Sequence, residues 1–464
     1  MKSMTVNEVY RVIGGRWLRG DPDVVVRRVS TDSRQIRPGE LFFALRGPRY
    51  DGHDFLAQAV AAGAAGLVVA ADVKVSFPIP VIGVGDTLAA LQALAAYNRR
   101  QYHVPVVGIT GSSGKTTTKD MVAAVLETGL QVLKTKGNMN NEIGLPLTLL
   151  DFSATHGAAV LEMAMRGPGE IDALCLLARP TCAVISTIGM AHLERLGSVE
   201  NIARAKGEIL DHIAPDGFAL LPGDSPLARE QAKRCHGRVL YYGLAQGLDI
   251  YAHELRREGG GSRFTVVAGV ERCEVRLPLP GLHNVKNALA AAAVGLLLGL
   301  SPEQVSAGLS KVTLSGMRTE IIRGNNFTII NDAYNANPES TAAALQTMEE
   351  LAGGRRRVAV LGDMRELGPS AAEAHRQCGF EAVKGGVVLV IAVGGMAAQI
   401  AAGARQAGGE MIVVCRDNDQ ALQELQNRLL PDDLVLVKGS RAMAMEEIIR
   451  GLLKKEVDYT VLKD

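Results

Sequence analysis

A run of glycine, serine and threonine residues, Gly111 to Thr118, follows a short apolar segment in this chain. Gly111 and Gly114 let the backbone approach a bound group closely, and the N-terminus of a following helix favours an anion. Lys115 would neutralise the β- and γ-phosphates of a nucleotide, and the Thr116 hydroxyl would bind Mg²⁺. The residues predicted to bind phosphate are therefore Gly111, Ser112, Ser113, Gly114, Lys115, Thr116 and Thr117.

The stretch departs from the strict phosphate-loop motif at its first glycine. The motif needs glycine five residues before the glycine of Gly-Lys-Thr, where this chain has Ile109, and the neighbouring glycines are Gly108 and Gly111. The alternative is an ordinary glycine-rich turn. A buried strand is predicted at 104–109 and helical spacing begins at Lys119, so Gly-Lys-Thr lies between a strand and a helix. That context favours phosphate binding.

Three titratable residues after the loop are further candidates. Glu162 ends an apolar run at 158–161, and a carboxylate at the C-terminal end of a strand beside a phosphate loop usually holds the metal of the nucleotide. His192 follows a second predicted strand, but alone it is more typical of a partly buried structural histidine. Lys206 lies in a predicted helix at 199–213 and could equally be a solvent-exposed lysine.

Two polar stretches could contact a substrate. Asn138 and Asn141 lie in an asparagine-rich loop whose amides can hydrogen-bond a ligand, although such loops are often only turns. Ser30, Ser33 and Arg34 follow a predicted strand and could bind a diphosphate or a nucleotide. A turn with a surface arginine is an equally good interpretation of this second stretch.

The overall composition limits the classes of protein to consider. Lys and Arg total 50 against 49 Asp and Glu, and this net charge of +1 argues against nucleic acid as the main partner. The six cysteines form no CxxC pair, which favours a reducing compartment and no structural zinc. The N-terminus has no apolar signal core, and the longest apolar run, at 288–300, is shorter than the ~20 residues that span a bilayer. We expect a cytoplasmic protein without membrane insertion.

A length of 464 residues exceeds what one hydrophobic core supports, and the spacing of elements predicts three α/β domains. Residues 1–100 are expected to form a small α/β domain, and residues 101–316 a central phosphate-loop domain with a parallel-rich sheet. Residues 317–464 are expected to form a Rossmann-like, doubly wound domain. Open α/β sheets bind ligands at the C-terminal ends of their strands, where this third domain has the loops Gly362–Gly368 and Lys438–Arg441.

The predicted elements follow from apolar periodicity. In the first domain they are strands at 24–29, 40–45 and 65–70 and a helix at 55–63. In the central domain they include strands at 104–109, 158–161 and 182–185 and helices at 119–128, 199–213 and 288–299. In the third domain strands at 328–330, 358–361, 387–393, 411–415 and 434–437 alternate with helices at 338–352, 370–384, 396–407, 418–429 and 441–454.

Several of these residues occur in an order that resembles the Mur ligases of peptidoglycan synthesis. The ordered set is Thr110–Thr117, Glu162, His192, Lys206, Gly281–Asn287, Arg318 and Asn331–Pro338. The resemblance covers essentially the whole chain, and so many ordered motifs rarely occur together by chance.

Two features separate the members of that family. Residues 1–100 lack the GxGxxG motif with which two of the ligases begin and instead resemble the two later-acting ligases. The segment Arg416–Gln420 lacks the Asp-Asn-Pro-Arg loop of the enzymes that add diaminopimelate or lysine. The loops Gly362–Gly368 and Lys438–Arg441 resemble those of the members that add D-alanyl-D-alanine.

The resemblance implies a monomeric, ATP-dependent ligase that adds D-alanyl-D-alanine to UDP-N-acetylmuramoyl-tripeptide through an acyl phosphate. It implies two Mg²⁺ ions, one held by Thr116 and Glu162 and the other by His192 and a carbamylated Lys206. The implied catalytic residues are Lys115, Glu162, His192 and Lys206, and further nucleotide contacts are Asn287, Arg318 and Asp332. Candidate substrate-binding residues are Ser30, Ser33, Arg34, Asn138, Asn141, Lys438, Ser440 and Arg441.

Two positions depart from the pattern of the family. Ala164 stands where relatives often have glycine, which could shift the loop slightly. Ala333 stands where they usually have serine, which removes one hydroxyl near the nucleotide. Neither change removes a charged catalytic group.

Other functions remain open on the sequence alone. A related ligase could add diaminopimelate or lysine instead, and a folylpolyglutamate synthase shares the ATP chemistry but lacks a nucleotide-sugar domain like residues 1–100. A phosphate-loop switch or motor would hydrolyse ATP without an amine acceptor. The sequence fixes neither the third residue of the peptide, nor the oligomeric state, nor the resting arrangement of the domains.

Overall fold

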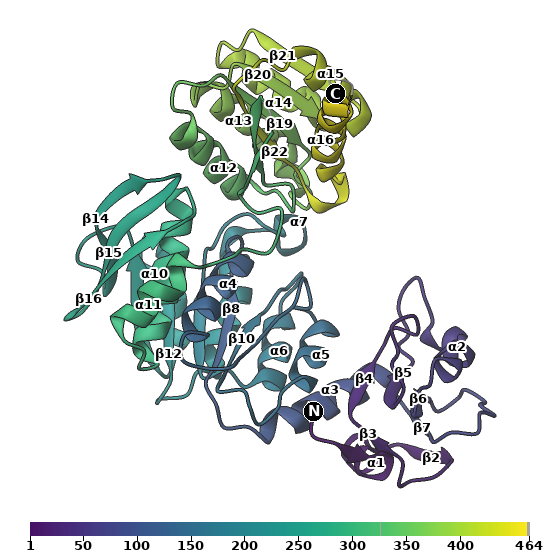
Figure 1. The fold of residues 1–464 in the computed structure, drawn as a ribbon. Helices are drawn as coiled ribbons and strands as arrows, with labels where there is room; N and C mark the ends of the chain where they lie inside the picture. Colours follow the sequence, from purple (N-terminus) through teal and green to yellow (C-terminus); the bar gives the residue numbers. More distant parts are fainter. Residues whose placement is uncertain (325, 462–464) are drawn as a thin grey trace.

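The computed structural model describes residues 1–324 and 326–461, and the central part of the chain lies between the N-terminal and C-terminal parts (Figure 1). Each part is built on its own β-sheet: the N-terminal sheet has five strands, the central sheet nine and the C-terminal sheet six. A two-stranded ribbon lies near the N-terminus. This arrangement agrees with the α/β fold class predicted from the sequence.

The N-terminal sheet has the order β2-β7-β6-β5-β4, and only its β2–β7 pair is antiparallel. Its strands are β2 (Arg16–Arg19), β4 (Arg28–Ser30), β5 (Glu40–Phe43), β6 (Gly66–Ala70) and β7 (Val81–Val84). The ribbon pairs β1 (Met4–Thr5) with β3 (Val25–Val26), and the helices are α1 (Val6–Ile13), η1 (Gly52–Phe55) and α2 (Leu56–Ala61). The strand expected at 24–29 is therefore two strands, β3 and β4, that pair with different partners.

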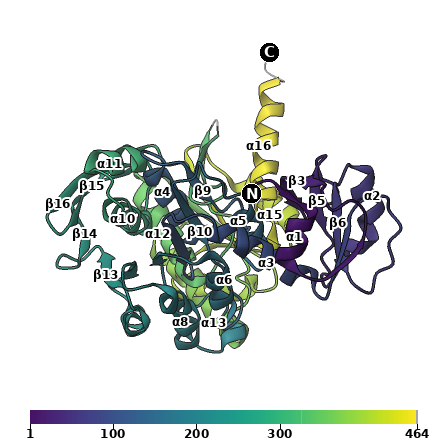
Figure 2. The same cartoon turned by 90° about the horizontal axis from the view of Figure 1, so that it is seen from below.

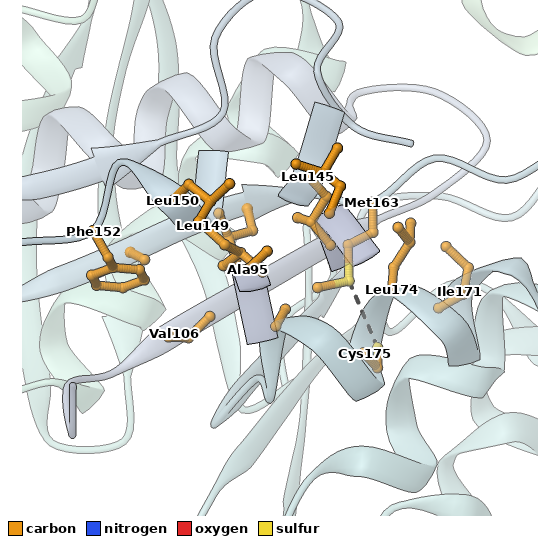
Figure 3. Packing of buried hydrophobic residues seen from close by; sticks show 14 of the residues in the cluster. Ala95, Val106, Leu145, Leu149, Leu150, Phe152, Met163, Ile171, Leu174 and Cys175 are labelled. Carbon is orange, nitrogen blue, oxygen red and sulfur yellow. Dashed lines mark hydrogen bonds between the residues drawn. The ribbon is translucent and has the colours of Figure 1, made fainter. Parts of the chain in front are cut away.

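Helix α3 (Thr87–Arg100) joins this domain to the next one. The Asp86 carboxylate caps it by accepting hydrogen bonds from the Leu88 and Ala89 amides. Its buried face belongs to the same hydrophobic cluster as residues of α5 and α6, and Figure 3 shows Ala95 near Leu145 and Leu149. The helix that ends the predicted domain 1–100 is thus packed against the central domain.

The central sheet has the order β16-β15-β14-β13-β12-β11-β8-β10-β9. Its strands are β8 (Val106–Thr110), β9 (Val132–Lys134), β10 (Ala158–Glu162), β11 (Cys182–Ile185), β12 (Phe218–Pro222), β13 (Arg238–Gly243), β14 (Ile250–Glu258), β15 (Gly261–Ala268) and β16 (Glu271–Leu277). All pairs are parallel except β14–β15 and β15–β16. This antiparallel extension has no counterpart among the predicted elements.

The central domain has helices on both faces of this sheet and at its junction with the C-terminal domain (Figures 1 and 2). They are α4 (Lys115–Leu126), α5 (Gly144–Leu150), α6 (Glu170–Ala178), α7 (Leu193–Leu196), α8 (Val199–Gly207), η2 (Glu208–His212), α9 (Pro226–Gln231), η3 (Ala232–Arg234), α10 (Leu282–Leu297) and α11 (Pro302–Ser310). Two helices begin earlier than expected. Helix α4 starts at Lys115, directly after its N-cap residue Gly114, and α10 includes Leu282 to Asn287, which lie before the predicted helix 288–299.

The C-terminal sheet has the order β17-β18-β22-β19-β20-β21, and only β17 is antiparallel to its neighbour. The strands are β17 (Glu320–Arg323), β18 (Phe327–Asn331), β19 (Arg357–Gly362), β20 (Leu389–Val393), β21 (Met411–Cys415) and β22 (Asp433–Lys438). The helices are α12 (Pro338–Leu351), η4 (Gly368–Ser370), α13 (Ala371–Lys384), α14 (Ala397–Gln406), α15 (Asn418–Arg428), η5 (Arg441–Met443) and α16 (Glu446–Val461). The parallel strands match the prediction closely, whereas β17 is additional and the last helix begins at Glu446 rather than at residue 441.

Candidate functional site

The phosphate-loop stretch forms a tight turn between β8 and α4. Gly111 and Gly114 have φ angles of 152° and 78°, in the region that favours glycine. A Cβ atom on Gly111 would lie 2.0 Å from the Ser186 Oγ, and one on Gly114 would lie 2.9 Å from the Asn287 Oδ1. Both glycines are therefore required by the close approach of neighbouring segments.

The loop after β11 holds the phosphate loop in place. The Ser112 amide donates to the Thr187 carbonyl at 2.9 Å, and the Ser113 amide donates to the Thr187 Oγ1 at 2.8 Å. The Ser112 hydroxyl donates to the Gly189 carbonyl at 3.0 Å. Three hydrogen bonds thus hold the turn against the neighbouring segment, and preorganised groups of this kind favour electrostatic catalysis.

Lys115 lies at the first position of α4 and points back over the turn. Its Nζ donates to the Gly111 carbonyl at 2.7 Å. Burial lowers the pKa of its ammonium group, and the nearby Glu162 carboxylate partly opposes this effect. A positive charge is thus held in a region of low dielectric, where its interaction with a phosphate group is strong.

Glu162 ends β10, beside Ile109 of β8. Its Oε2 accepts from the Thr116 Oγ1 at 2.8 Å, and its Oε1 accepts from the Asn140 Nδ2 at 2.7 Å. The pair predicted to hold the metal of the nucleotide is therefore adjacent. Asn140 was not among the predicted site residues. The Asn141 Oδ1 accepts hydrogen bonds from the Ile143 and Gly144 amides at the start of α5.

His192 and Lys206 lie on two successive segments after β11. His192 has a φ angle of 66°, and its Nδ1 is paired with the Glu366 carboxylate of the C-terminal domain. Lys206 is 1% exposed, and burial together with the charge of Lys115 places its pKa well below the usual range of lysine. The sequence left a solvent-exposed Lys206 open, and the structure excludes that alternative.

A cavity of about 310 Å³ lies between the central and C-terminal domains and contains most of the predicted nucleotide contacts. Its lining includes Ser112, Ser113, Gly114, Lys115, Thr116, Thr117, Asn138, Glu162, His192, Asn287, Arg318, Asp332 and Lys438. Gly111 and Lys206 are not part of this lining, although Gly111 contacts Lys115 directly. Two domains therefore contribute to one site.

Arg318 enters the cavity from the segment that joins the two domains. Its guanidinium carbon lies 3.9 Å from the centre of the Tyr334 ring, and its buried Nε has no hydrogen-bond partner among the residues that the structure describes. Both of its neighbours, Met317 and Thr319, have left-handed backbone conformations, with φ angles of 61° and 50°. Such conformations are disfavoured for these residue types, and they concentrate at functional sites.

Asp332 lies beside this segment, directly after the end of β18. Its Oδ1 accepts from the Thr319 amide at 3.0 Å, and its Oδ2 pairs with the Lys438 ammonium group. Lys438 also donates to the Asn335 carbonyl at 2.9 Å. Lys438 was predicted to contact the amine substrate, but the structure places it within the cavity beside the residue predicted to bind ribose.

Sequence reasoning assigned no individual role to several residues of the cavity lining. They include Asn140, Ser186, Thr187, His283, Lys286, Tyr334, Asn335, Asn337 and Ser340. His283 lies near Asp332 and Lys438, and burial lowers the pKa of its imidazole to about 4, so that it is neutral at pH 7. His283 and Lys286 lie within the motif 281–287, which was a signal that could have identified them.

The remaining substrate candidates lie outside this cavity. The Ser440 hydroxyl accepts from the Arg365 amide at 2.8 Å, and Arg441 pairs with Glu446 at 2.7 Å. The two loops at the strand ends of the C-terminal domain are therefore in contact. Ser30, Ser33 and Arg34 lie in the N-terminal domain, where they contact Asp32 and Gln58.

Comparison with known proteins identifies the family of this chain. Residues 25–136 match the model of the Mur ligase family catalytic domain, residues 109–295 the Mur ligase middle domain, and residues 317–441 the Mur ligase glutamate ligase domain. The chain belongs to the Mur ligase family. The model of the middle domain contains the phosphate loop, Glu162, His192 and Lys206, and the model of the third domain contains Arg318 and Asp332.

Individual relatives match this Mur ligase along almost its whole length. It is 41% identical to the UDP-N-acetylmuramoyl-tripeptide–D-alanyl-D-alanine ligase of Bacillus subtilis, over 98% of this chain and 99% of the relative. The corresponding ligase of Escherichia coli is 36% identical, over 97% and 99%. Among solved structures, the MurF of Acinetobacter baumannii has a TM-score of 0.90 and 34% identity, over 98% of this chain and 99% of that one.

Another structural neighbour distinguishes fold from function. A folylpolyglutamate synthase of Mycobacterium tuberculosis in complex with ADP has a TM-score of 0.64 at 20% identity, and it covers 78% of this chain. At that identity the likeness shows a shared fold alone. It does not favour the alternative in which this Mur ligase is a folylpolyglutamate synthase.

The two departures from the family pattern both donate a backbone hydrogen bond to a nearby asparagine. Ala164 lines the cavity, and its amide donates to the Asn140 carbonyl at 2.9 Å. Ala333 is fully buried, and its amide donates to the Asn331 Oδ1 at 3.3 Å. No group of three or more His, Cys, Asp or Glu side chains within residues 1–324 and 326–461 could by itself hold a metal ion. Within the same residues, no helix has the length and apolar character needed to cross a membrane.

Proposed function

We propose that this chain joins D-alanyl-D-alanine to the tripeptide carboxylate of UDP-N-acetylmuramoyl-tripeptide and consumes ATP in the reaction. The observation that carries the proposal is one cavity in which Lys115 and Glu162 of the central domain face Arg318 and Asp332 of the C-terminal domain. The relatives with 36–41% identity over nearly the full length are named for this reaction.

The chemistry must activate a carboxylate. A carboxylate oxygen of the tripeptide attacks the γ-phosphorus of ATP, which forms an acyl phosphate and releases ADP. The amine of D-alanyl-D-alanine then attacks the carbonyl carbon, loses a proton, and phosphate leaves with the original carboxylate oxygen. Two anions meet in the first step, so catalysis rests on positioning and on neutralisation of charge. The desolvated Lys115 ammonium group is suited to that role.

Residues around the phosphate loop fit a divalent cation. Thr116 and Glu162 supply hard oxygen donors 2.8 Å apart, and Mg²⁺ is typically held by one or two carboxylates together with phosphate oxygens and water. We infer that these two residues hold the Mg²⁺ ion of the nucleotide, which would neutralise phosphate charge. The small number of protein ligands agrees with this mode of binding.

A second Mg²⁺ ion would be held by His192 and a carbamylated Lys206. A plain ammonium group would repel the ion, whereas a carbamate is an anionic oxygen ligand. Burial of Lys206 and its lowered pKa support this role, because the neutral amine is the form that reacts with CO₂.

The nucleotide would lie across both domains. Asn287 would contact adenine, Asp332 the ribose hydroxyls and Arg318 the phosphates. Lys438 pairs with Asp332 and would hold its carboxylate in position. We infer from this contact that Lys438 acts on the nucleotide side, while Ser440 and Arg441 stay candidates for the amine substrate.

The sugar nucleotide would bind through Ser30, Ser33 and Arg34 of the N-terminal domain, and Asn138 and Asn141 would contact its peptide. The six cysteines are free thiols, which agrees with action in the reducing cytoplasm. We infer that a monomer is the active unit, with both walls of the cavity formed by one chain.

The proposal is tested by the release of ADP from ATP with defined substrates. ADP should appear in step with product only when both UDP-N-acetylmuramoyl-tripeptide and D-alanyl-D-alanine are present. Competition among amines then tests specificity, which we assign to residues 317–464. Preferential ligation of diaminopimelate or lysine would refute the choice of amine, and release of ADP without any amine would refute the ligase mechanism.

A further inference from the structure

Helix α4 carries a buried ion pair that none of the proposed catalytic steps uses. The Lys119 Nζ lies 2.7 Å from the Asp120 Oδ1, and their side chains are 3% and 7% exposed. Removing two charges from water is costly, and such a pair often stabilises a fold less than apolar side chains would. The role of this ion pair is therefore inferred from its hydrogen bonds to neighbouring segments.

The second oxygen of Asp120 holds the segment between the domains. The Asp120 Oδ2 accepts a hydrogen bond from the Ser315 amide at 2.9 Å. Ser315 lies after the last helix of the central domain and just before the left-handed residues Met317 and Thr319. The phosphate-loop helix is thus attached directly to the start of the strained segment.

The other end of that segment is attached to the C-terminal domain. The Thr319 amide donates to the Asp332 Oδ1 at 3.0 Å, and the Tyr334 amide donates to the Met317 carbonyl at 3.2 Å. Arg318 lies between these attachments, with its side chain in the cavity. A segment held at Ser315 and at Thr319 has little freedom to turn Arg318 elsewhere.

The partner of Asp120 connects to the opposite wall of the site. The Lys119 Nζ donates to the Thr135 carbonyl at 3.1 Å, and the Thr135 Oγ1 accepts from the Glu162 amide at 3.0 Å. One buried pair is therefore bonded both to the segment that carries Arg318 and to the strand end that carries Glu162.

We propose that Asp120 is a positioning residue for nucleotide binding: it fixes the segment between the domains so that Arg318 faces the phosphates. The proposal rests on the nucleotide site described under the proposed function. Asp120 acts through Arg318, so its effect on nucleotide binding should disappear when Arg318 is absent. A residue that only stabilises the fold would not show this dependence.

The test is the dissociation constant of ADP, measured by calorimetry on the full chain and three variants. Asp120→Asn keeps the size of the side chain but removes its charge, and it should weaken ADP binding about tenfold. Arg318→Ala should weaken binding by at least as much. The double variant should bind no more weakly than Arg318→Ala alone, because the two residues act as a unit.

Asp433→Asn is the matched control. Asp433 is fully buried and pairs with Arg356 at 2.9 Å, but it lies at the start of β22, away from the cavity. This variant removes an equivalent buried charge and should leave ADP binding unchanged. Thermal unfolding of all variants shows whether the loss of stability is comparable.

A second variant tests the same hydrogen bond if Asp120→Asn does not fold. Ser315→Pro removes the amide donor, fixes the φ angle of residue 315 and leaves both charges of the ion pair in place. It should weaken ADP binding as Asp120→Asn does. Wild-type affinity for ADP in Ser315→Pro, or independent and multiplicative effects in the double variant, would overturn the proposal. Failure of the unmodified chain to bind ADP would instead overturn the nucleotide site itself.

Discussion

The phosphate loop and the Ser30–Arg34 stretch both place hydroxyl groups and one cation after a strand, but the fold treats them differently. Lys115 is enclosed by segments of the central and C-terminal domains, and burial lowers its pKa. The Arg34 side chain is 77% exposed and pairs with Asp32, two residues away. A charge in a buried cavity acts at low dielectric, whereas an exposed pair contributes little. The same residue pattern therefore predicts a preformed site in the first case and a ligand-dependent one in the second.

The largest effect is expected at Lys115, which lines the cavity. Lys115→Ala should reduce ligase turnover by ~10²–10³, because a preorganised charge contact to the transferred phosphoryl group is lost. The measurement is the rate of ADP release with both substrates present. Lys134→Ala removes a lysine that pairs with Glu127 near the surface and should leave the rate unchanged. Equal rates for Lys115→Ala and the unmodified chain would place the phosphoryl transfer elsewhere.

Two variants of Lys206 test the region around the phosphate loop further. Lys206→Ala should lower the rate by about 10², and a small carboxylic acid at high concentration should restore part of it by taking the vacated ligand position. Lys206→Arg should be equally inactive and should not be rescued, because a guanidinium group stays charged and cannot take up CO₂. Normal activity of Lys206→Arg would exclude the carbamate.

A variant in the exposed Ser30–Arg34 stretch should change substrate binding rather than turnover. Arg34→Ala should raise the KM for UDP-N-acetylmuramoyl-tripeptide about tenfold, because one charged hydrogen bond to the ligand is removed. The KM for ATP and the value of kcat should not change. Lys74→Ala, another exposed cation of the same domain, is the control. A fall in kcat with an unchanged KM would show that Arg34 acts on the reaction itself.

A further effect concerns the stability of the fold at low pH rather than the reaction. His283 has a pKa of about 4 in the folded chain against 6.5 ordinarily, so the unfolded chain takes up the proton first. The stability that neutral His283 provides is complete above about pH 6.5 and declines as the pH falls toward 4, by up to roughly 3 kcal/mol. His283→Asn lacks this dependence.

The measurement for His283 is the difference in thermal midpoint between the wild-type chain and His283→Asn at pH 7.5 and pH 5. The difference should become smaller, or reverse, at the lower pH. A constant difference would show that His283 titrates normally in the folded chain.

Local features of the site could be predicted from the sequence, whereas contacts between distant segments could not. The turn at Gly111 and Gly114 follows from short-range rules, and so does the carboxylate at the end of β10. Lys438 makes one of the contacts that could not be predicted from the sequence. It could be recognised as a residue at a strand end, but its contact with Asp332 depends on the direct pairing of β22 with β18. That pairing joins segments about a hundred residues apart and has no local signal.

The absence of a local sequence signal also explains the remaining differences between the predictions and the structure. Asn140, which was not predicted as a site residue, contacts Glu162 through a fold of the loop that no local pattern indicates. The partner of His192 is Glu366, which belongs to another domain. From Arg272 to Leu277, the sequence of β16 alternates between polar and apolar residues. This alternation could have predicted a strand of the antiparallel extension.

The most direct test of the account follows one oxygen atom. UDP-N-acetylmuramoyl-tripeptide labelled with ¹⁸O in its reacting carboxylate is incubated with the chain, ATP, Mg²⁺ and D-alanyl-D-alanine, and the released phosphate is analysed by mass spectrometry. An acyl phosphate predicts one ¹⁸O atom in each phosphate released, in step with the formation of the ligated product. Unlabelled phosphate would contradict the mechanism, because it would mean that water rather than the carboxylate had attacked ATP.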